Sequence, residues 1–224
     1  MRWLSLLLML YFISGNAQEN APYQYVLSAK EKRNVVKLVY QSYTVLYDTL
    51  LKMPREITYV VTRSSQKGAS RDRYYKKAPQ IDSIHTLVKE DWDSAYAKYG
   101  YQKGHLAPLG SLDSADRYYE LNYFVNIAPQ SRNLNQGPWQ LLEEKVRVLA
   151  QELDSIWVTT GTKFEGFQKR LPHCQKDHEV PSHFYKVLVF WENGKKVVYS
   201  FLMDQNSRSK NIYDYATTYE ELME

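Results

Sequence analysis

Apolar and β-branched residues gather into short runs along much of this chain, and polar segments with glycine or proline separate the runs. Two such runs within residues 43–62 predict two strands joined by a proline-containing turn. Residues 156–160 predict another strand, and residues 184–203 predict a β-hairpin. In that hairpin, Asn193 and Gly194 form a pair suited to a type I′ turn. The pattern therefore indicates a sheet with antiparallel pairing.

A second periodicity, that of an amphipathic helix, extends from Pro138 to about Leu153. Proline is tolerated in the first turn of a helix, where a backbone N–H has no partner in any case. The apolar residues that recur at helical spacing are Trp139, Leu142, Val146 and Leu149. Glu143 and Arg147 are four residues apart, so both project from one face of this helix. Several strands with one prominent helix indicate an α+β fold built on a central antiparallel sheet.

The remaining segments carry weaker patterns. Residues 64–78 are polar and basic without periodicity, and we expect them to form a loop. Residues 123–128 are mostly apolar and predict a short buried strand. No repeat, low-complexity segment or linker interrupts the chain, so we expect one domain over residues 18–224.

Composition narrows the class of protein without identifying it. Hydrophobic residues make up 44% and charged residues 24%, which is typical of a soluble globular protein, and 20 tyrosines favour β-structure. The formal net charge of +4 is compatible with a polyanionic substrate, but it is far below that of dedicated nucleic-acid-binding arms. Because Cys174 is the single cysteine, no intrachain disulfide can form.

Residues 1–17 have the pattern of a secretory signal peptide. Arg2 supplies the positive charge, an apolar core follows, and small residues end at Ala17, where a signal peptidase would cut. The apolar run is too short to span a bilayer. We therefore expect a secreted or periplasmic protein with no stable membrane association after cleavage, and of an oligomeric state that the sequence does not fix.

Candidate chemistry concentrates between residues 101 and 147. A histidine, two asparagines, a carboxylate and a guanidinium follow one another there: His105, Asn126, Asn135, Glu143 and Arg147. A base, an oxygen ligand for a metal, an acid and a cation together suit phosphoryl transfer. Each also has a structural interpretation, as a solvated histidine, a capping asparagine or an exposed ion pair.

The order of these residues resembles the DNA/RNA non-specific endonuclease family of ββα-metal nucleases. The family block Asp-Arg-Gly-His stands here as Gln102, Lys103, Gly104 and His105. A second block, Asn-x-x-Pro-Gln followed by Asn-x-Gly-x-Trp-x-x-Leu-Glu, is intact. Its residues are Asn126, Pro129, Gln130, Asn135, Gly137, Trp139, Leu142 and Glu143, with Arg147 one turn later. The resemblance implies a ββα-metal nuclease fold, in which helices and long loops flank a central antiparallel sheet.

The resemblance also implies a function and residue roles. The chain would be a secreted, metal-dependent endonuclease that hydrolyses DNA and RNA without sequence specificity. His105 would be the general base, and Asn135 would be the single protein ligand of a hydrated Mg²⁺, with Mn²⁺ as the alternative ion. Glu143 would orient water around the metal, Asn126 would help to organise the site, and Arg147 would contact the scissile phosphate.

Two further basic residues would bind substrate by the same resemblance. Lys103 lies in the first block, and Arg73 matches the position of an upstream basic contact, with Arg71 as the near alternative. All of these contacts are directed at phosphate, metal or water. Since none reaches a base edge, the sequence of the nucleic acid would not be read.

Two departures from the family pattern stand beside the predicted base. Gln102 replaces an aspartate, which removes a negative charge, and Lys103 replaces an arginine, which removes a planar group able to grip phosphate with two bonds. We expect slower catalysis or an altered grip on substrate. A catalytically weakened or inactive member, acting as an exported nucleic-acid-binding module, is the alternative. A third possibility is a nuclease whose substrates are restricted to single strands, because their bases stack on exposed tyrosines.

Other polar residues carry weaker signals. His173, Cys174, His178 and His183 cluster in the sequence, but their spacing fits no standard zinc pattern, so we expect a polar loop that leads into a strand. Cys174 is expected to be an unreactive thiol. His85 has no partner in the sequence and is expected at the surface or at a helix cap.

Overall fold

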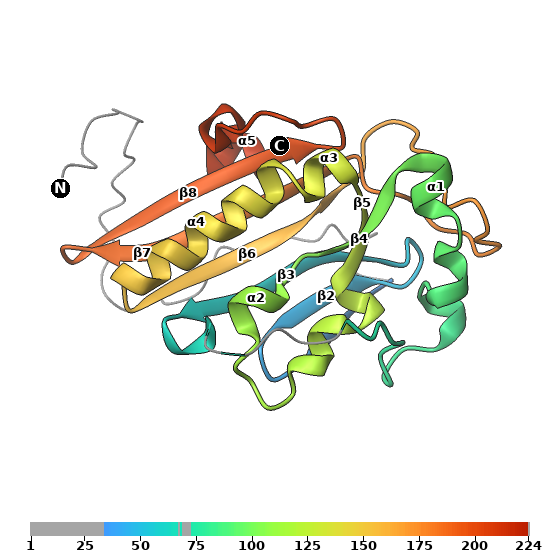
Figure 1. Cartoon of the computed structure of the whole chain (residues 1–224), viewed down its shortest axis with the longest axis horizontal. Coiled ribbons are helices and arrows are strands. Elements are labelled where there is room, and N and C mark those ends of the chain that lie inside the picture. The colour runs from blue at the N-terminus through green and yellow to red at the C-terminus, as the bar shows by residue number, and fades with distance from the viewer. Residues whose placement is uncertain (1–33, 67, 69–72, 224) are drawn as a thin grey trace.

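A computed structural model describes residues 34–66, 68 and 73–223. The predicted signal peptide and Arg71 lie outside these described residues. The largest layer is a seven-stranded antiparallel sheet of order β1-β2-β3-β6-β7-β8-β9 (Figure 1). Its strands are β1 Val35–Val39, β2 Thr44–Asp48, β3 Met53–Thr62, β6 Ser155–Lys163, β7 His183–Glu192, β8 Lys195–Asp204 and β9 Ala216–Thr217. The predicted central antiparallel sheet is therefore confirmed.

A smaller ββα unit lies against one face of this sheet. Strands β4 Tyr101–His105 and β5 Ile127–Ser131 pair in an antiparallel manner, and α3 Arg132–Asn135 and α4 Pro138–Glu152 follow β5 directly. Helix α4 lies over the sheet and runs roughly along the direction of β6 and β7 (Figure 1), with contacts to β3 and β6. The other α-helices are the short segments α1 Ala95–Tyr99, α2 Leu109–Leu112 and α5 Tyr219–Met223.

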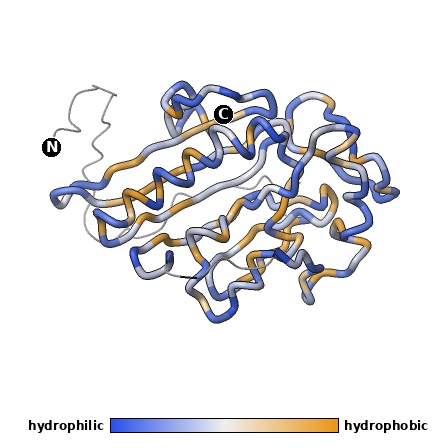
Figure 2. The backbone as a smooth tube through the Cα atoms, in the orientation of Figure 1, coloured by the Kyte–Doolittle hydropathy of each residue, from blue (hydrophilic) through white to orange (hydrophobic). Residues whose placement is uncertain are grey.

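Helix α4 follows its sequence pattern closely. Pro138 occupies its first turn, and the helix ends at Glu152, one residue before the predicted end. Its buried residues are Pro138, Trp139, Leu142, Val146 and Ala150, which form one apolar stripe against the sheet. Figure 2 shows the resulting alternation of hydrophobic and hydrophilic residues along the helix. Burial of this stripe leaves the polar face of α4 free to contribute to a site.

The predicted hairpin is also confirmed, as strands β7 and β8. Asn193 and Gly194 link them with φ of 51° and 75°. Both angles lie in the left-handed region that a type I′ turn requires, and asparagine and glycine reach that region more easily than other residues.

The proline of the first strand pair does not lie in the turn where it was predicted. Pro54 is the second residue of β3 and is paired with Tyr47 of β2, next to a shift in register between the strands. The turn itself ends at Lys52, whose φ is 57°. Proline is accepted here because an irregular pairing does not need the backbone N–H that proline lacks.

The strand predicted over residues 123–128 is correct only in part. A 3₁₀ helix, Phe124–Asn126, comes first, and β5 begins at Ile127. A short apolar run reports burial without distinguishing a strand from a helical turn. No helix among the described residues has the length and apolar character needed to cross a membrane.

Candidate functional site

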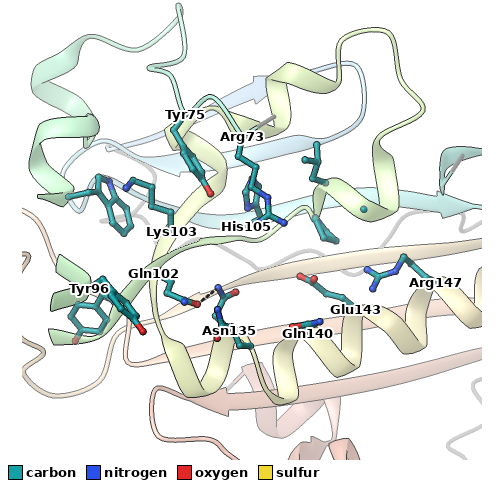
Figure 3. A pocket seen from close by; sticks show the side chains of 16 residues that line it. Arg73, Tyr75, Tyr96, Gln102, Lys103, His105, Asn135, Gln140, Glu143 and Arg147 are labelled. Carbon is teal, nitrogen blue, oxygen red and sulfur yellow. Dashed lines mark hydrogen bonds between the residues drawn. The ribbon is translucent and has the colours of Figure 1, made fainter. Parts of the chain in front are cut away.

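A pocket of about 760 Å³ opens where the ββα unit meets the loop at residues 73–75 (Figure 3). Six of the seven predicted site residues line it: Arg73, Lys103, His105, Asn135, Glu143 and Arg147. They come from the loop, β4, α3 and α4, so segments distant in the sequence contribute to one concave surface. The seventh predicted residue, Asn126, is fully buried and is absent from the lining.

His105 is the last residue of β4 and is fixed by Asn122. The Nε2 atom of His105 lies 3.1 Å from Oδ1 of Asn122. Because a carbonyl oxygen only accepts hydrogen bonds, Nε2 carries the proton in this arrangement and Nδ1 keeps its lone pair. The ring of Tyr75 packs beside the imidazole, with centroids 5.6 Å apart.

The electrostatic environment keeps the imidazole uncharged. Burial lowers the pKa of His105 to about 4, and the positive charge of Arg73 lowers it further, whereas the bond to Asn122 acts in the opposite direction. His105 is therefore neutral at neutral pH, as a proton acceptor must be. Asn122 was missed in the sequence, because no spacing marks a residue that reaches the base only through the fold.

Gly104 permits close packing behind the histidine. A Cβ at this position would lie 2.0 Å from the side-chain oxygen of Gln130, which is fully buried on β5. Any larger residue at this position would collide with the side chain of Gln130. The glycine of the first sequence block thus leaves room for the buried side chain of Gln130 beside the strand carrying His105.

Asn126 lies beneath the pocket and joins the segments that follow β4 and precede β5. Its Oδ1 accepts a hydrogen bond of 2.8 Å from the backbone N–H of Ala107. Its Nδ2 donates to the carbonyl oxygens of Ala107 at 2.9 Å and Leu121 at 2.8 Å. These bonds occupy the amide, so Asn126 acts on the site through the backbone it holds.

Asn135 is the last residue of α3, and its amide has a fixed orientation. Its Nδ2 donates a 2.8 Å hydrogen bond to Oε1 of Gln102, as the dashed line in Figure 3 shows. The donor side of the amide is thereby engaged, and Oδ1 remains as an acceptor at the pocket. Gln102 was treated in the sequence as a departure from the family, yet it supplies an acceptor to this residue.

The donor set suits a hard cation that keeps most of its water. No group of three or more His, Cys, Asp or Glu residues able to hold a metal occurs in the described part of the chain. The pocket instead offers the amide oxygen of Asn135 and the carboxylate of Glu143. Oxygen donors in small number fit Mg²⁺, which loses water reluctantly, better than zinc.

Glu143 and Arg147 project from α4 into the same pocket, as their spacing predicted (Figure 3). Burial raises the pKa of Glu143 to about 7, while the positive charges of Lys186 and Arg147 and a hydrogen bond with Trp139 act to lower it. Burial thus disfavours the charged form of the carboxyl group in the protein without substrate or metal. A cation bound beside it would favour the carboxylate.

Lys103 lies between two aromatic rings. Its Nζ is 5.4 Å from the ring centroid of Trp92 and 5.5 Å from that of Tyr75, which are cation–π contacts. Burial lowers the pKa of Lys103. These rings give the flexible lysine a preferred position on the pocket wall, a feature that the sequence did not reveal. Arg73, by contrast, is exposed.

One exposed tyrosine also lines the pocket. Tyr96 of α1 is 49% exposed, and its hydroxyl accepts a 3.0 Å hydrogen bond from Nη1 of Arg132. Buried tyrosines are numerous elsewhere: Tyr40, Tyr43, Tyr47, Tyr59, Tyr101, Tyr123 and Tyr185 all belong to the core. Much of the tyrosine content therefore has a structural role.

Two histidines outside the pocket, His178 and His183, have local partners. His178 is buried, and its Nε2 accepts from the backbone N–H of Leu171 at 3.2 Å while Nδ1 lies 3.0 Å from the carbonyl oxygen of Lys176. His183 lies at the start of β7, and its Nδ1 is 2.9 Å from the hydroxyl of Ser182. His85 is exposed at the end of a 3₁₀ helix.

Comparison with known proteins identifies relatives over most of the chain. The profile of the DNA/RNA non-specific endonuclease family matches residues 19–224. A nuclease of Serratia marcescens is 32% identical over 192 residues, which cover 84% of this chain and 71% of that protein. The mitochondrial nuclease EXOG of Xenopus laevis is 28% identical over 185 residues, which cover 78% of this chain. The match spans 49% of EXOG, about half of its length.

A solved structure shares the fold. A chain from the crystal structure of the EndoG/EndoGI complex superposes with a TM-score of 0.70 at 23% sequence identity. The match covers 83% of this chain and 81% of that chain. At this identity the likeness concerns the fold, and it accounts for the ββα unit and the large antiparallel sheet together.

Proposed function

The chain belongs to the DNA/RNA non-specific endonuclease family and has the ββα-metal nuclease fold, and we propose that it is an exported, metal-dependent endonuclease that hydrolyses DNA and RNA without sequence specificity. One observation carries this proposal. A neutral histidine, an amide oxygen, a carboxylate and three cationic side chains meet in a single pocket. Each group has a task in phosphodiester hydrolysis.

His105 would act as the general base. Its Nδ1 would take the proton of the attacking water, while the bond from Nε2 to Asn122 would hold the ring and stabilise the imidazolium that forms. A pKa of about 4 belongs to the protein without substrate. A phosphate close to the ring raises the pKa of the histidine, because an opposite charge favours the protonated form. Substrate binding would thus strengthen the base when it is needed.

Asn135 would bind the metal through Oδ1, and Glu143 would orient water beside it. When bound, Mg²⁺ or Mn²⁺ would supply positive charge against the charge that develops on the phosphate oxygens. Gln102 would keep the Asn135 amide from rotating its N–H group towards the cation. Asn126 would support the site from below, through the segments it joins.

Three cations would hold the nucleic acid. Arg147 would contact the scissile phosphate, and Lys103 and Arg73 would bind the adjoining backbone. Contacts to phosphate position a nucleic acid without reading its bases, and none of them depends on the 2′ position of the sugar. This supports cleavage of both DNA and RNA.

Export rests on the first residues of the sequence. The charge of Arg2, the apolar core and the small residues ending at Ala17 support removal of residues 1–17 and release of the domain formed by residues 18–224. The mature chain would then be secreted or periplasmic, without membrane anchorage. Amino-terminal sequencing of the exported protein tests this, with Gln18 as the expected first residue.

The activity itself is tested by incubating the mature chain with supercoiled plasmid and with structured RNA, in Mg²⁺, in Mn²⁺ and in EDTA. We expect both substrates to be cut at many positions in either metal, and no cleavage in EDTA. Nucleic-acid binding that persists in EDTA, with no cleavage in any divalent ion, would instead identify a nucleic-acid-binding module that has lost catalysis.

A further inference from the structure

A fully buried lysine lies under the candidate site and has no part in the chemistry described so far. Lys186 is in the middle of β7, paired with Thr160 of β6 and Phe201 of β8, and its exposure is 0%. Removing an ammonium group from water costs free energy unless a partner compensates for the loss. The contacts of Lys186 therefore indicate which groups compensate for burial of its charge.

The immediate contacts of the ammonium group are aromatic. Its Nζ donates a 3.1 Å hydrogen bond to the hydroxyl of Tyr59, on β3. It lies 4.3 Å from the ring centroid of Trp139, at the start of α4, and 5.7 Å from that of Tyr59. These contacts fix the position of the charge between the sheet and the helix. The acid on which this charge acts lies on the same helix as Trp139.

Glu143 is that acid. The positive charge of Lys186 lowers the pKa of Glu143, and the negative charge of Glu143 raises the pKa of Lys186, although burial has the larger effect on each. The other cations that act on Glu143 are Arg147 on the same helix and Arg73 on the facing loop, and Tyr59 faces it from β3. Lys186 differs from both arginines because it cannot reach the pocket surface.

This difference matters once a phosphate occupies the pocket. Arg147 and Arg73 line the pocket, so a bound nucleic acid would neutralise their charge. A nucleic acid in the pocket would not contact Lys186, so it would not neutralise the charge that this lysine presents to Glu143. Trp139 extends the connection, since its indole N–H donates to the backbone oxygen of His105 at 3.4 Å and also bonds Glu143.

We propose that Lys186 is a positioning residue: a buried countercharge, out of reach of the substrate, that favours the carboxylate form of Glu143 for the metal and packs on Trp139 beside the strand carrying His105. This inference rests on the proposed nuclease function and assigns to the site a residue that does not touch substrate. Without Lys186, the positive charges that act on Glu143 would be those of Arg147 and Arg73, which would also bind the substrate.

The test compares Lys186→Met, which keeps the length of the side chain and removes its charge, with a matched control. Lys52 is also buried, at 7% exposure, and its Nζ donates to the backbone oxygens of Leu50 and Asp177, away from the pocket. Lys52→Met therefore reports the general cost of losing a buried ammonium group. Circular dichroism and thermal melting establish that each variant is folded.

Two measurements separate positioning from simple stability. Mn²⁺ binding to the full mature protein without nucleic acid, followed by electron paramagnetic resonance, should weaken roughly ten- to a hundredfold in Lys186→Met, since opposite charges interact more strongly in a buried setting than in water. The kcat should fall by a similar factor, while the KM for nucleic acid changes little. Lys52→Met should leave the Mn²⁺ affinity and the kcat unaltered.

A double-mutant cycle gives the sharper result. In the Glu143→Gln background, Lys186→Met should have little further effect on Mn²⁺ affinity, because the negative charge of Glu143 on which Lys186 acts has been removed. Additive effects of the two substitutions would overturn the proposal. If Lys186→Met does not fold, Tyr59→Phe removes the acceptor of the ammonium group and should weaken Mn²⁺ binding several-fold; unchanged binding in that variant also overturns the proposal. Failure of the wild-type protein to cleave any substrate would count against the nuclease function instead.

Discussion

The side-chain amide of Asn135 donates a 2.8 Å hydrogen bond to Oε1 of Gln102. The two residues lie on different elements, α3 and β4, and the bond fixes which side of the Asn135 amide faces the pocket (Figure 3). Gln102 stands where the family block has an aspartate. It retains a carbonyl acceptor for the neighbouring amide and gives up a negative charge, so the orientation of Asn135, the proposed metal ligand, is preserved while the attraction for a cation is reduced.

Substitutions at Gln102 can separate these two effects. Gln102→Leu removes the acceptor and should raise the Mg²⁺ concentration needed for half-maximal rate by roughly two- to tenfold. This factor corresponds to the loss of one hydrogen bond. Gln102→Asp keeps the acceptor, adds a negative charge and should lower the Mg²⁺ concentration needed for half-maximal rate. The measurement is the initial rate on one DNA and one RNA substrate across a Mg²⁺ titration. Asn135→Ala, which removes the proposed ligand itself, sets the lowest rate expected in this titration. A Gln102→Leu titration identical to that of the wild type would contradict the role of the bond.

Lys103 is the second departure from the family block, and substitution by arginine reverses it. Arginine in its place can make two parallel hydrogen bonds to phosphate and can also stack on Trp92 and Tyr75. Lys103→Arg should therefore lower KM, by no more than about tenfold because the lysine is already held by both rings. Combined with Gln102→Asp, the gain in kcat/KM should stay within roughly a hundredfold, the value of one charge-assisted hydrogen bond. A slower enzyme on both substrates would mean that the native pair is adapted to this site.

His105 should titrate well below the usual range of a histidine. Its pKa is lowered to about 4 by burial, so the folded protein holds the ring neutral while the unfolded chain binds a proton near pH 6.5. Stability from this group is present above pH 6.5 and is lost as the pH falls towards 4. NMR of ¹⁵N-labelled histidine in the metal-free protein should find the Nε2–H tautomer and a midpoint near 4. An Nδ1–H tautomer at pH 7 would contradict the bond to Asn122.

The features that the sequence predicted well are those with strong local signals. Helix α4 has one apolar stripe and a proline in its first turn, and the β7–β8 hairpin has the Asn193-Gly194 pair. The position of Pro54 was wrong because a register shift, which depends on the partner strand, decides where a proline fits. The segment at residues 123–128 was only partly correct, since its apolar character reports burial alone.

The site residues show the same division between those with a local sequence signal and those that depend on the fold. The two sequence blocks span the ββα unit, which is continuous in the chain from β4 to α4, and five of their residues reach the pocket: Gln102, Lys103, His105, Asn135 and Glu143. Asn122, which lies between the blocks, and Lys186, which comes from β7, gain their significance from three-dimensional packing. No spacing rule connects a residue in the middle of a sheet with an acid on the helix above it.

Chemical rescue of the base tests the central claim most directly. His105→Gly should remain folded and bind nucleic acid in EDTA as the wild type does, while its cleavage rate in Mg²⁺ should fall roughly 10²–10⁴-fold, the usual contribution of a general base. Added imidazole should restore a substantial part of the rate, more so as the pH rises and a larger fraction of the imidazole is neutral. A variant that keeps more than half of the wild-type rate, or one that stays folded and bound to substrate yet gains nothing from imidazole, would contradict the assignment of His105 as the base.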